Sequence, residues 1–257
     1  MKTVLTIAAS DPSGGAGIQA DLRAIAAHGL YGMAVPTALT VQNTLGVSGV
    51  LVPEPEFLER QLRAVLSDIR PDAVKIGAMP GADHARVTAG LLREFDAANV
   101  VFDPVLASTS GAALGTVEAV EILASSVSLL TPNLPEAAKL LGRDPAEPVT
   151  PDRIESAAEE LAARFHAAVL LKGGHRTDGS FDDFFFAPGN EGVWLPTRIA
   201  PPCGNHGTGC LLSSSIACGL ASGLSMLESV RCAKERLSDA LARRLSLGHG
   251  NSPVDFR

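Results

Sequence analysis

The 257-residue sequence lacks several features that would assign it to a common class. It has no run of about 18 uncharged apolar residues, so we expect no membrane span. It has no basic excess: the net charge is −7 at pH 7, which argues against nucleic-acid binding. The cysteines form no Cys-x-x-Cys pair, so we expect free thiols in a cytoplasmic protein and no disulfide framework or zinc site. They are Cys203, Cys210, Cys218 and Cys232.

Short apolar runs alternate with helical patterns along the chain. The runs indicate buried parallel strands and cover residues 4–9, 34–41, 73–76, 100–102, 127–130 and 167–171. Apolar residues at helical spacing form one stripe over Phe57, Leu58, Leu62, Val65, Leu66 and Ile69, and another over Ile154, Ala158, Leu161 and Phe165. Residues 181–186 and 193–199 predict an antiparallel pair near one edge. This order predicts an α/β fold of one domain over residues 1–257, with an open, mostly parallel sheet and helices on both faces.

The segment Gly-Thr-Gly-Cys at residues 207–210 is the most informative local feature. Its two glycines let the backbone approach a ligand closely, and the apolar run that follows favours a helix. At that helix start, the N–H groups of Gly207, Thr208 and Gly209 would form an anion site. Cys210 would have a lowered thiol pKa there and could act as a base. A glycine-rich turn with a buried cysteine is the alternative for this segment alone.

A second glycine-rich segment, Ser-Asp-Pro-Ser-Gly-Gly-Ala-Gly at residues 10–17, follows the first predicted strand. A helical pattern at Ile18, Leu22 and Ile25 comes next. Strand, glycine-rich turn and helix are typical of a ligand-binding loop at the carboxyl end of a strand. The segment matches neither the Walker A pattern, which needs Gly-Lys-Ser/Thr, nor the dinucleotide fingerprint.

Polar residues follow most of the predicted strands, at the point where each strand ends. In an open parallel sheet, ligands bind beyond these carboxyl ends. Each residue alone could be a cap or a turn residue, but together they predict a binding site. They are Asp11, Gln42, Asp103, Asn133 and Lys172.

These motifs together resemble the hydroxymethylpyrimidine/phosphomethylpyrimidine kinases of thiamin biosynthesis, which belong to the ribokinase-like superfamily. The matching segments run in order along nearly the whole chain, at residues 10–22, 38–44, 75–77, 103–105, 131–137, 172–175 and 206–210. The resemblance implies a ribokinase-like kinase domain that uses ATP and Mg²⁺. It implies phosphorylation of 4-amino-5-hydroxymethyl-2-methylpyrimidine and of its monophosphate. We also expect a homodimer.

The resemblance further implies roles for individual residues. Cys210 would take the proton of the acceptor hydroxyl, while the loop at residues 207–209 stabilises the transferring phosphoryl group. Asp21 and Gln42 match residues of the pyrimidine pocket. A carboxamide such as that of Gln42 can both donate to and accept from the edge of an aminopyrimidine. His206, beside the loop, is expected to be a positioning or packing residue.

Other matched residues correspond to the phosphate end of the family's site. Asn133 and Glu136 resemble the Asn-x-x-Glu element associated with magnesium and phosphate, and one carboxylate acting through water suits Mg²⁺. The same two residues also fit a variant of the capping box at a helix start, and both readings can hold together. Lys172 matches the nucleotide side. Asp103 matches the metal and nucleotide region, or it holds loop N–H groups.

The chain departs from the family in two loops. Thr109 replaces a loop lysine and Ala112 replaces an acid. The segment at residues 202–206 loses a second cation, and Gly204 stands where the family carries a polar group. We therefore expect a weakened second phosphorylation, because a phosphate monoester brings its own negative charge. Two alternatives are a pyridoxal/pyridoxine kinase, which Gln42 argues against, and a catalytically weak relative that senses the pyrimidine.

Overall fold

A computed structural model describes residues 1–108, 111–145, 150–174, 180–197, 206–243 and 245–256. Thr109, Gly204, Cys203 and His175 lie outside these ranges, so the expectations about them stay predictions. In the described residues, Cys210, Cys218 and Cys232 are free thiols, as predicted. No helix in these ranges is long and apolar enough to cross a membrane.

Strands of the described residues form one sheet in the order β3-β2-β1-β4-β5-β6-β7-β8-β9. The parallel centre consists of β2 (Tyr31–Asn43), β1 (Thr3–Ser10), β4 (Ala73–Ile76), β5 (Val100–Phe102), β6 (Leu129–Leu130) and β7 (Ala168–Leu171). The antiparallel edges are β3 (Gly46–Leu51) on one side and β8 (Asp183–Phe186) with β9 (Val193–Leu195) on the other. The apolar runs thus predicted the central strands and the antiparallel β8–β9 pair.

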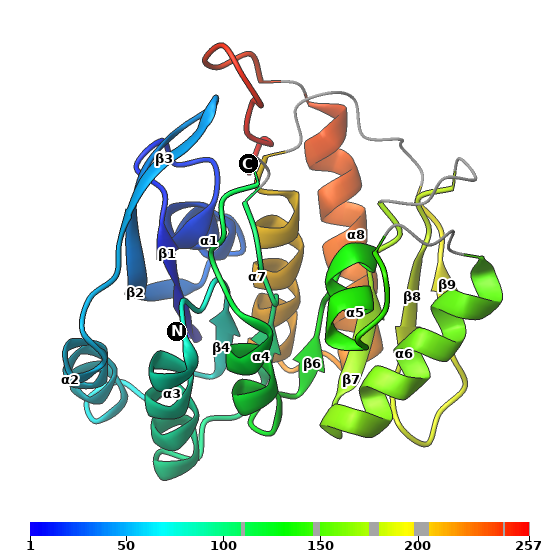
Figure 1. Ribbon diagram of the computed structural model, residues 1–257, viewed down its shortest axis with the longest axis horizontal. Coiled ribbons are helices and arrows are strands. Elements are labelled where there is room, and N and C mark those ends of the chain that lie inside the picture. Colours follow the sequence, from blue (N-terminus) through cyan, green and yellow to red (C-terminus); the bar gives the residue numbers. More distant parts are fainter. Residues whose placement is uncertain (109–110, 146–149, 175–179, 198–205, 244, 257) are drawn as a thin grey trace.

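Helices cover both faces of the sheet, as the alternating pattern predicted (Figure 1). One face carries α2 (Pro55–Leu66), α3 (Ala82–Glu94), α4 (Val117–Ala124), α5 (Leu134–Leu140) and α6 (Pro151–Phe165). The other carries α1 (Gly17–Ala27), α7 (Thr208–Ala221) and α8 (Met226–Ala242). The α/β fold class is therefore confirmed.

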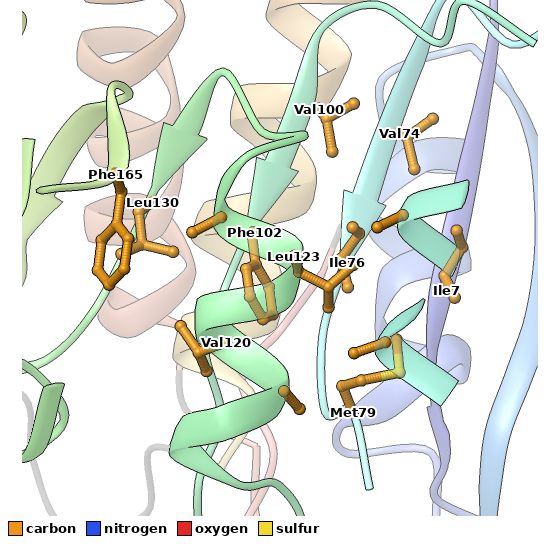
Figure 2. Close-up of a cluster of buried hydrophobic side chains, with 14 of the residues drawn as sticks. Ile7, Val74, Ile76, Met79, Val100, Phe102, Val120, Leu123, Leu130 and Phe165 are labelled. Carbon is orange, nitrogen blue, oxygen red and sulfur yellow. The ribbon is translucent and has the colours of Figure 1, made fainter. Parts of the chain in front are cut away.

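The larger core lies between the strands and the helices α2 to α6. Figure 2 shows strand residues such as Ile76 and Phe102 packed against Val120 and Leu123 of α4. The predicted apolar stripe of α6 is buried throughout. In α2, Leu58, Leu62 and Leu66 are buried. Phe57 is 48% exposed, and Ile69, which follows the helix, is 36% exposed. The prediction that Phe57 and Ile69 belong to the buried stripe is therefore wrong. Ile69 lies beyond the end of α2, and Phe57 lies outside the buried face of the helix.

Candidate active site

A cavity of about 550 Å³ lies beyond the carboxyl ends of the parallel strands. The residues predicted to follow the strands all line it: Asp11, Gln42, Asp103, Asn133 and Lys172. They come from segments up to 161 residues apart, and the parallel sheet brings them to one edge because its strand ends meet there. The sequence pattern therefore located the cavity correctly.

The glycine-rich loop at residues 10–17 is held together by the Asp11 carboxylate. Asp11 accepts hydrogen bonds from the Ser13 N–H at 2.9 Å, the Ser13 hydroxyl at 2.7 Å and the Ala16 N–H at 2.9 Å. Its Oδ2 also lies 3.0 Å from Nε2 of His206. Burial raises the pKa of Asp11, but the hydrogen bonds from His206, Ser13 and Ala16 outweigh burial and hold this pKa below its usual value. Asp11 is thus an ionised carboxylate that fixes the loop.

The second loop leads directly into α7, as predicted. Gly207 has a φ of +87°, and a Cβ there would lie 2.0 Å from the Gly15 carbonyl oxygen, so only glycine fits. The helix begins at Thr208, without a side-chain cap and with no acidic residue in its first turn. Because the first N–H groups of a helix have no partner within it, this end of α7 presents donors and a partial positive charge. Gly207, Thr208 and Gly209 line the cavity, which suits an anion.

Cys210 also lines the cavity, in the first turn of α7. Burial raises the pKa of its thiol to about 12, although the nearby Lys75 ammonium and the Gly17 N–H act in the opposite direction. The expectation of a lowered thiol pKa is therefore wrong. Loss of hydration outweighs the favourable helix start, and the depth of burial is not visible in the sequence.

Asp21 lies beneath the cavity and is fully buried. Its Oδ2 accepts hydrogen bonds from Lys75 Nζ at 2.9 Å and the Thr6 hydroxyl at 2.6 Å, and its Oδ1 accepts from the Ser214 hydroxyl at 2.8 Å. The cavity lining includes Lys75 but not Asp21. The Asp21 side chain, expected in the pyrimidine pocket, thus does not line this cavity, whereas its ion-pair partner Lys75 does. The motif at residues 75–77 predicts no role for Lys75, although a charged residue inside an apolar strand is an available signal.

Three charged residues gather where β5, β7 and α5 meet the cavity. Lys172 Nζ donates to Asp103 Oδ1 at 2.7 Å. Burial lowers the pKa of Lys172, but Asp103 and Glu136 more than compensate and hold it above its usual value. Burial raises the pKa of Glu136 to about 7; Lys172 opposes this increase and Asp103 adds to it. The cluster holds one ammonium beside two carboxylates in a poorly hydrated place.

The capping-box alternative for Asn133 and Glu136 is confirmed. The Asn133 side chain accepts from the Glu136 N–H at 2.8 Å, and Glu136 accepts from the Asn133 N–H at 2.7 Å. Both residues nevertheless line the cavity, so the structural role leaves room for a functional one. Within the described ranges, no group of three His, Cys, Asp or Glu side chains could hold a metal ion.

Gln42 lies at the opposite part of the lining, beside His206. Its Oε1 accepts from the Thr40 hydroxyl at 3.1 Å, and its Nε2 lies 3.2 Å from His206 Nε2. His206 Nε2 can either donate to Asp11 or accept from the Gln42 amide, and in both cases at least one N–H of the amide has no partner on His206. The Gln42 NH₂ group therefore keeps at least one donor for a ligand, and its carbonyl keeps one lone pair. His206 is buried and contacts both Asp11 and Gln42, so its role as a positioning or packing residue stays a prediction.

Sequence reasoning missed a further polar group at this cavity. Lys234 of α8 donates to Asp183 Oδ2 at 2.6 Å and to the Thr197 hydroxyl at 3.0 Å, and Asp183 also accepts from the Gly173 N–H at 2.8 Å. Lys234, Asp183 and Thr197 all line the cavity. Nothing in their sequence spacing connects them, because the contact joins α8 to the antiparallel edge.

Comparison with known proteins identifies the family. A family model described as phosphomethylpyrimidine kinase matches residues 11–255. The chain belongs to the phosphomethylpyrimidine kinase family. Within this family it is 43% identical over 256 residues to the hydroxymethylpyrimidine/phosphomethylpyrimidine kinase of Escherichia coli, covering 97% of this chain and 95% of that protein. It is 42% identical to a thiamine biosynthesis multifunctional protein of Corynebacterium efficiens, covering 98% of this chain but spanning only 34% of that protein.

Solved structures agree with the family assignment. The phosphomethylpyrimidine kinase of Clostridium difficile is 36% identical, with a TM-score of 0.80 over 94% of this chain and 100% of that one. A Bacillus subtilis pyridoxal kinase, solved as an ADP complex, is 30% identical, with a TM-score of 0.89 over 100% of this chain and 97% of that one. The phosphomethylpyrimidine kinase family thus shares its ribokinase-like fold with pyridoxal kinases, which confirms the fold expected from the motifs.

Proposed function

We propose that this chain transfers the γ-phosphoryl group of ATP to the hydroxymethyl group of 4-amino-5-hydroxymethyl-2-methylpyrimidine, and then phosphorylates the monophosphate. One observation carries the proposal: a single cavity holds both the N-terminus of α7, which suits a phosphate, and the Gln42 carboxamide, which suits an aminopyrimidine edge. Family membership and relatives at 43% identity support the same reaction.

In the proposed reaction, the substrate hydroxyl oxygen attacks the γ-phosphorus while the bond to the bridging oxygen breaks and ADP leaves. Cys210 accepts the hydroxyl proton, which requires its thiolate form. The N–H groups at the start of α7 stabilise the charge on the transferring phosphoryl group. Lys172, held by Asp103, supplies a fixed positive charge at the same cavity.

The residues at the α5 end of the cavity fit a magnesium ion. Glu136 and Asn133 offer oxygen atoms, and Mg²⁺ commonly binds through one or two carboxylates together with water and substrate phosphates. Burial raises the pKa of Glu136 to about 7, with a smaller contribution from Asp103, and a cation bound there would favour the ionised carboxylate. We propose that these two residues hold the ion through water; when bound, it neutralises phosphate charge.

The reaction can be tested by product analysis. Purified protein is incubated with the hydroxymethylpyrimidine and ATP, with either Mg²⁺ or EDTA, and products are followed by mass spectrometry and ³¹P NMR. We expect the monophosphate and then the diphosphate, in the Mg²⁺ sample only. Absence of any pyrimidine phosphate with Mg²⁺ present would overturn the proposal.

Pyridoxal is the second candidate substrate. The TM-score of 0.89 to a pyridoxal kinase supports it, and both substrates are heteroaromatic rings that carry a hydroxymethyl group. The higher identity to hydroxymethylpyrimidine kinases supports the pyrimidine as the better substrate. We therefore propose at most a side activity on pyridoxal.

We further propose a homodimer formed through the face of β2 and β3. Apolar side chains are exposed along this hairpin: Val41 is 64%, Leu45 67% and Leu51 62% exposed. Several exposed apolar side chains on one hairpin favour an interaction site. Size-exclusion chromatography with light scattering should give twice the chain mass of 26.5 kDa. Val41→Lys with Leu51→Lys should give monomers, while Leu224→Lys, at an exposed leucine of another surface, should not; a monomeric unmodified chain would contradict the proposal.

A further inference from the structure

Lys75 carries a buried ammonium group, and the residue belongs to the lining of the cavity. The residue is 0% exposed and lies in β4, between the central strands β1 and β5. Its Nζ donates to Asp21 Oδ2 at 2.9 Å, and Asp21 is itself 0% exposed. Asp21 is also bonded to Ser214, one helical turn after Cys210 in α7. The ion pair thus connects the floor of the cavity with the first two turns of α7.

Stability alone does not explain this ion pair. Removing two charges from water costs about as much as their attraction returns, and apolar residues of similar volume often replace a buried pair without loss. The neighbouring strand positions Val74 and Ile76 are apolar, as expected in a central strand. The surroundings also leave room for the ammonium, because a Cβ on Gly77 would lie 2.8 Å from Lys75 Nζ. These features favour a function for the charge.

Asp21 links Lys75 to the start of α7: it accepts from Lys75 Nζ at 2.9 Å and from the hydroxyl of Ser214, which lies one helical turn after Cys210. Lys75 and Cys210 line the same cavity, and Lys75 lowers the pKa of Cys210, although burial raises it more. The carboxylates that oppose Lys75 are Asp21, from α1, and Asp103, from the end of β5; both raise the pKa of Cys210. Opposite charges of one ion pair therefore have opposite effects on the same thiol.

We propose that Lys75 is a positioning residue whose buried ammonium, anchored by Asp21, stabilises the thiolate of Cys210 for phosphoryl transfer. The inference rests on the proposed function, in which the Cys210 thiolate accepts the hydroxyl proton. The thiol first releases its proton to solvent. The thiolate then takes the substrate proton as the new O–P bond forms and ADP leaves, and the thiol returns to its starting form. Lys75 stays protonated throughout and takes no part in the proton transfer.

The test measures thiol reactivity without any substrate, so its failure is distinct from failure of the kinase reaction. Alkylation of Cys210 by iodoacetamide is followed by peptide mass spectrometry at several pH values, with the exposed Cys232 as internal control. Because only the thiolate reacts, the rate below the pKa falls as the pKa rises. The variants are Lys75→Met, Asp21→Asn and the double variant, in which neither charge remains.

We expect Lys75→Met to slow Cys210 alkylation by at least about threefold at fixed pH and Asp21→Asn to accelerate it by a similar factor, given that one pKa unit changes the thiolate fraction about tenfold. The double variant should fall between the two single variants, because it removes both opposing charges. A purely structural ion pair predicts the same direction for both single variants, because each breaks the same contact. Equal directions, or unchanged rates, would overturn the proposal. If Lys75→Met does not fold, the remaining comparison is between Asp21→Asn and the double variant. The proposal requires faster Cys210 alkylation in Asp21→Asn than in the double variant.

Discussion

Alanine substitutions at Gly207, just before α7, and at Gly209, in its first turn, should have different effects. We expect the first to lower stability and the second to lower the catalytic rate. Gly207 has a φ of +87°, and a Cβ there would lie 2.0 Å from a backbone oxygen, that of Gly15. Gly209 has ordinary helical backbone, and its Cβ would meet only side-chain atoms, Asp103 Oδ2 at 3.0 Å and Lys172 Nζ at 3.5 Å. Alanine at the two positions therefore separates damage to the fold from damage to the site.

For Gly207→Ala, the left-handed backbone alone costs about 1–2 kcal/mol. The overlap with Gly15 adds to this cost, because two backbone segments must move apart. We expect a loss of at least about 2 kcal/mol, which lowers the Tm by about 4–8 °C for a chain of this size. For Gly209→Ala, alanine is favoured over glycine in a helix by up to about 1 kcal/mol, which offsets the small shift of Asp103.

Gly209→Ala should therefore keep its Tm within about 3 °C of the unmodified protein, since about 1 kcal/mol corresponds to 2–4 °C. Its kcat should fall by about 10²-fold, because the added methyl group moves Asp103 and Lys172 in the cavity. This is the loss seen when one donor to a transition-state oxyanion is displaced. Differential scanning calorimetry and a coupled ADP-release assay measure the two quantities. The reasoning is refuted if Gly207→Ala unfolds at the same temperature as the unmodified protein, or if Gly209→Ala retains full kcat.

Three further predictions concern the base, the loop cation and acid stability. Cys210→Ala should lower kcat by about 10²–10⁴ and leave the substrate Kd nearly unchanged, which kinetics and calorimetry check. Thr109→Lys should raise kcat/KM for the monophosphate more than for the uncharged alcohol, because a monoester brings about −2 charge; equal gains would contradict this. Burial and Arg236 lower the pKa of His28 from 6.5 to about 4. Between these pH values the unfolded chain binds a proton at His28 and the folded chain does not, so the free energy of unfolding decreases as the pH falls from 6.5 towards 4. His28→Asn should lose less Tm between pH 7 and pH 4.5 than the unmodified protein.

The sequence predicted the central strands because buried parallel strands are continuous apolar runs, as in residues 73–76. It missed β3, since Gly46–Leu51 contains two glycines and has no buried residue, so no apolar run marks it. The antiparallel β8–β9 pair was found because it combines apolar runs with a Pro-Gly-Asn turn. Periodicity indicates strands and helices only where burial on one or both faces orders the side chains.

For the site, residues that follow strands were found because the topology alone brings them together. Interactions between distant side chains were not accessible. The pairing of Asp21 with Lys75 spans 54 residues, and nothing in either segment specifies it. The pKa of Cys210 depends on burial and on charges from three other elements, so the local rule for helix starts gave the wrong direction. The sequence thus indicates which residues lie at the site, but not how distant charges and burial change their pKa values.

The most direct test of the proposed function compares substrates under identical conditions. ADP release is measured with ATP and Mg²⁺ for the hydroxymethylpyrimidine, its monophosphate and pyridoxal, and kcat/KM is compared. Selection by the Gln42 carboxamide predicts that the hydroxymethylpyrimidine has a higher kcat/KM than pyridoxal and that Gln42→Ala reduces this ratio. A higher kcat/KM for pyridoxal in the unmodified protein would contradict the account.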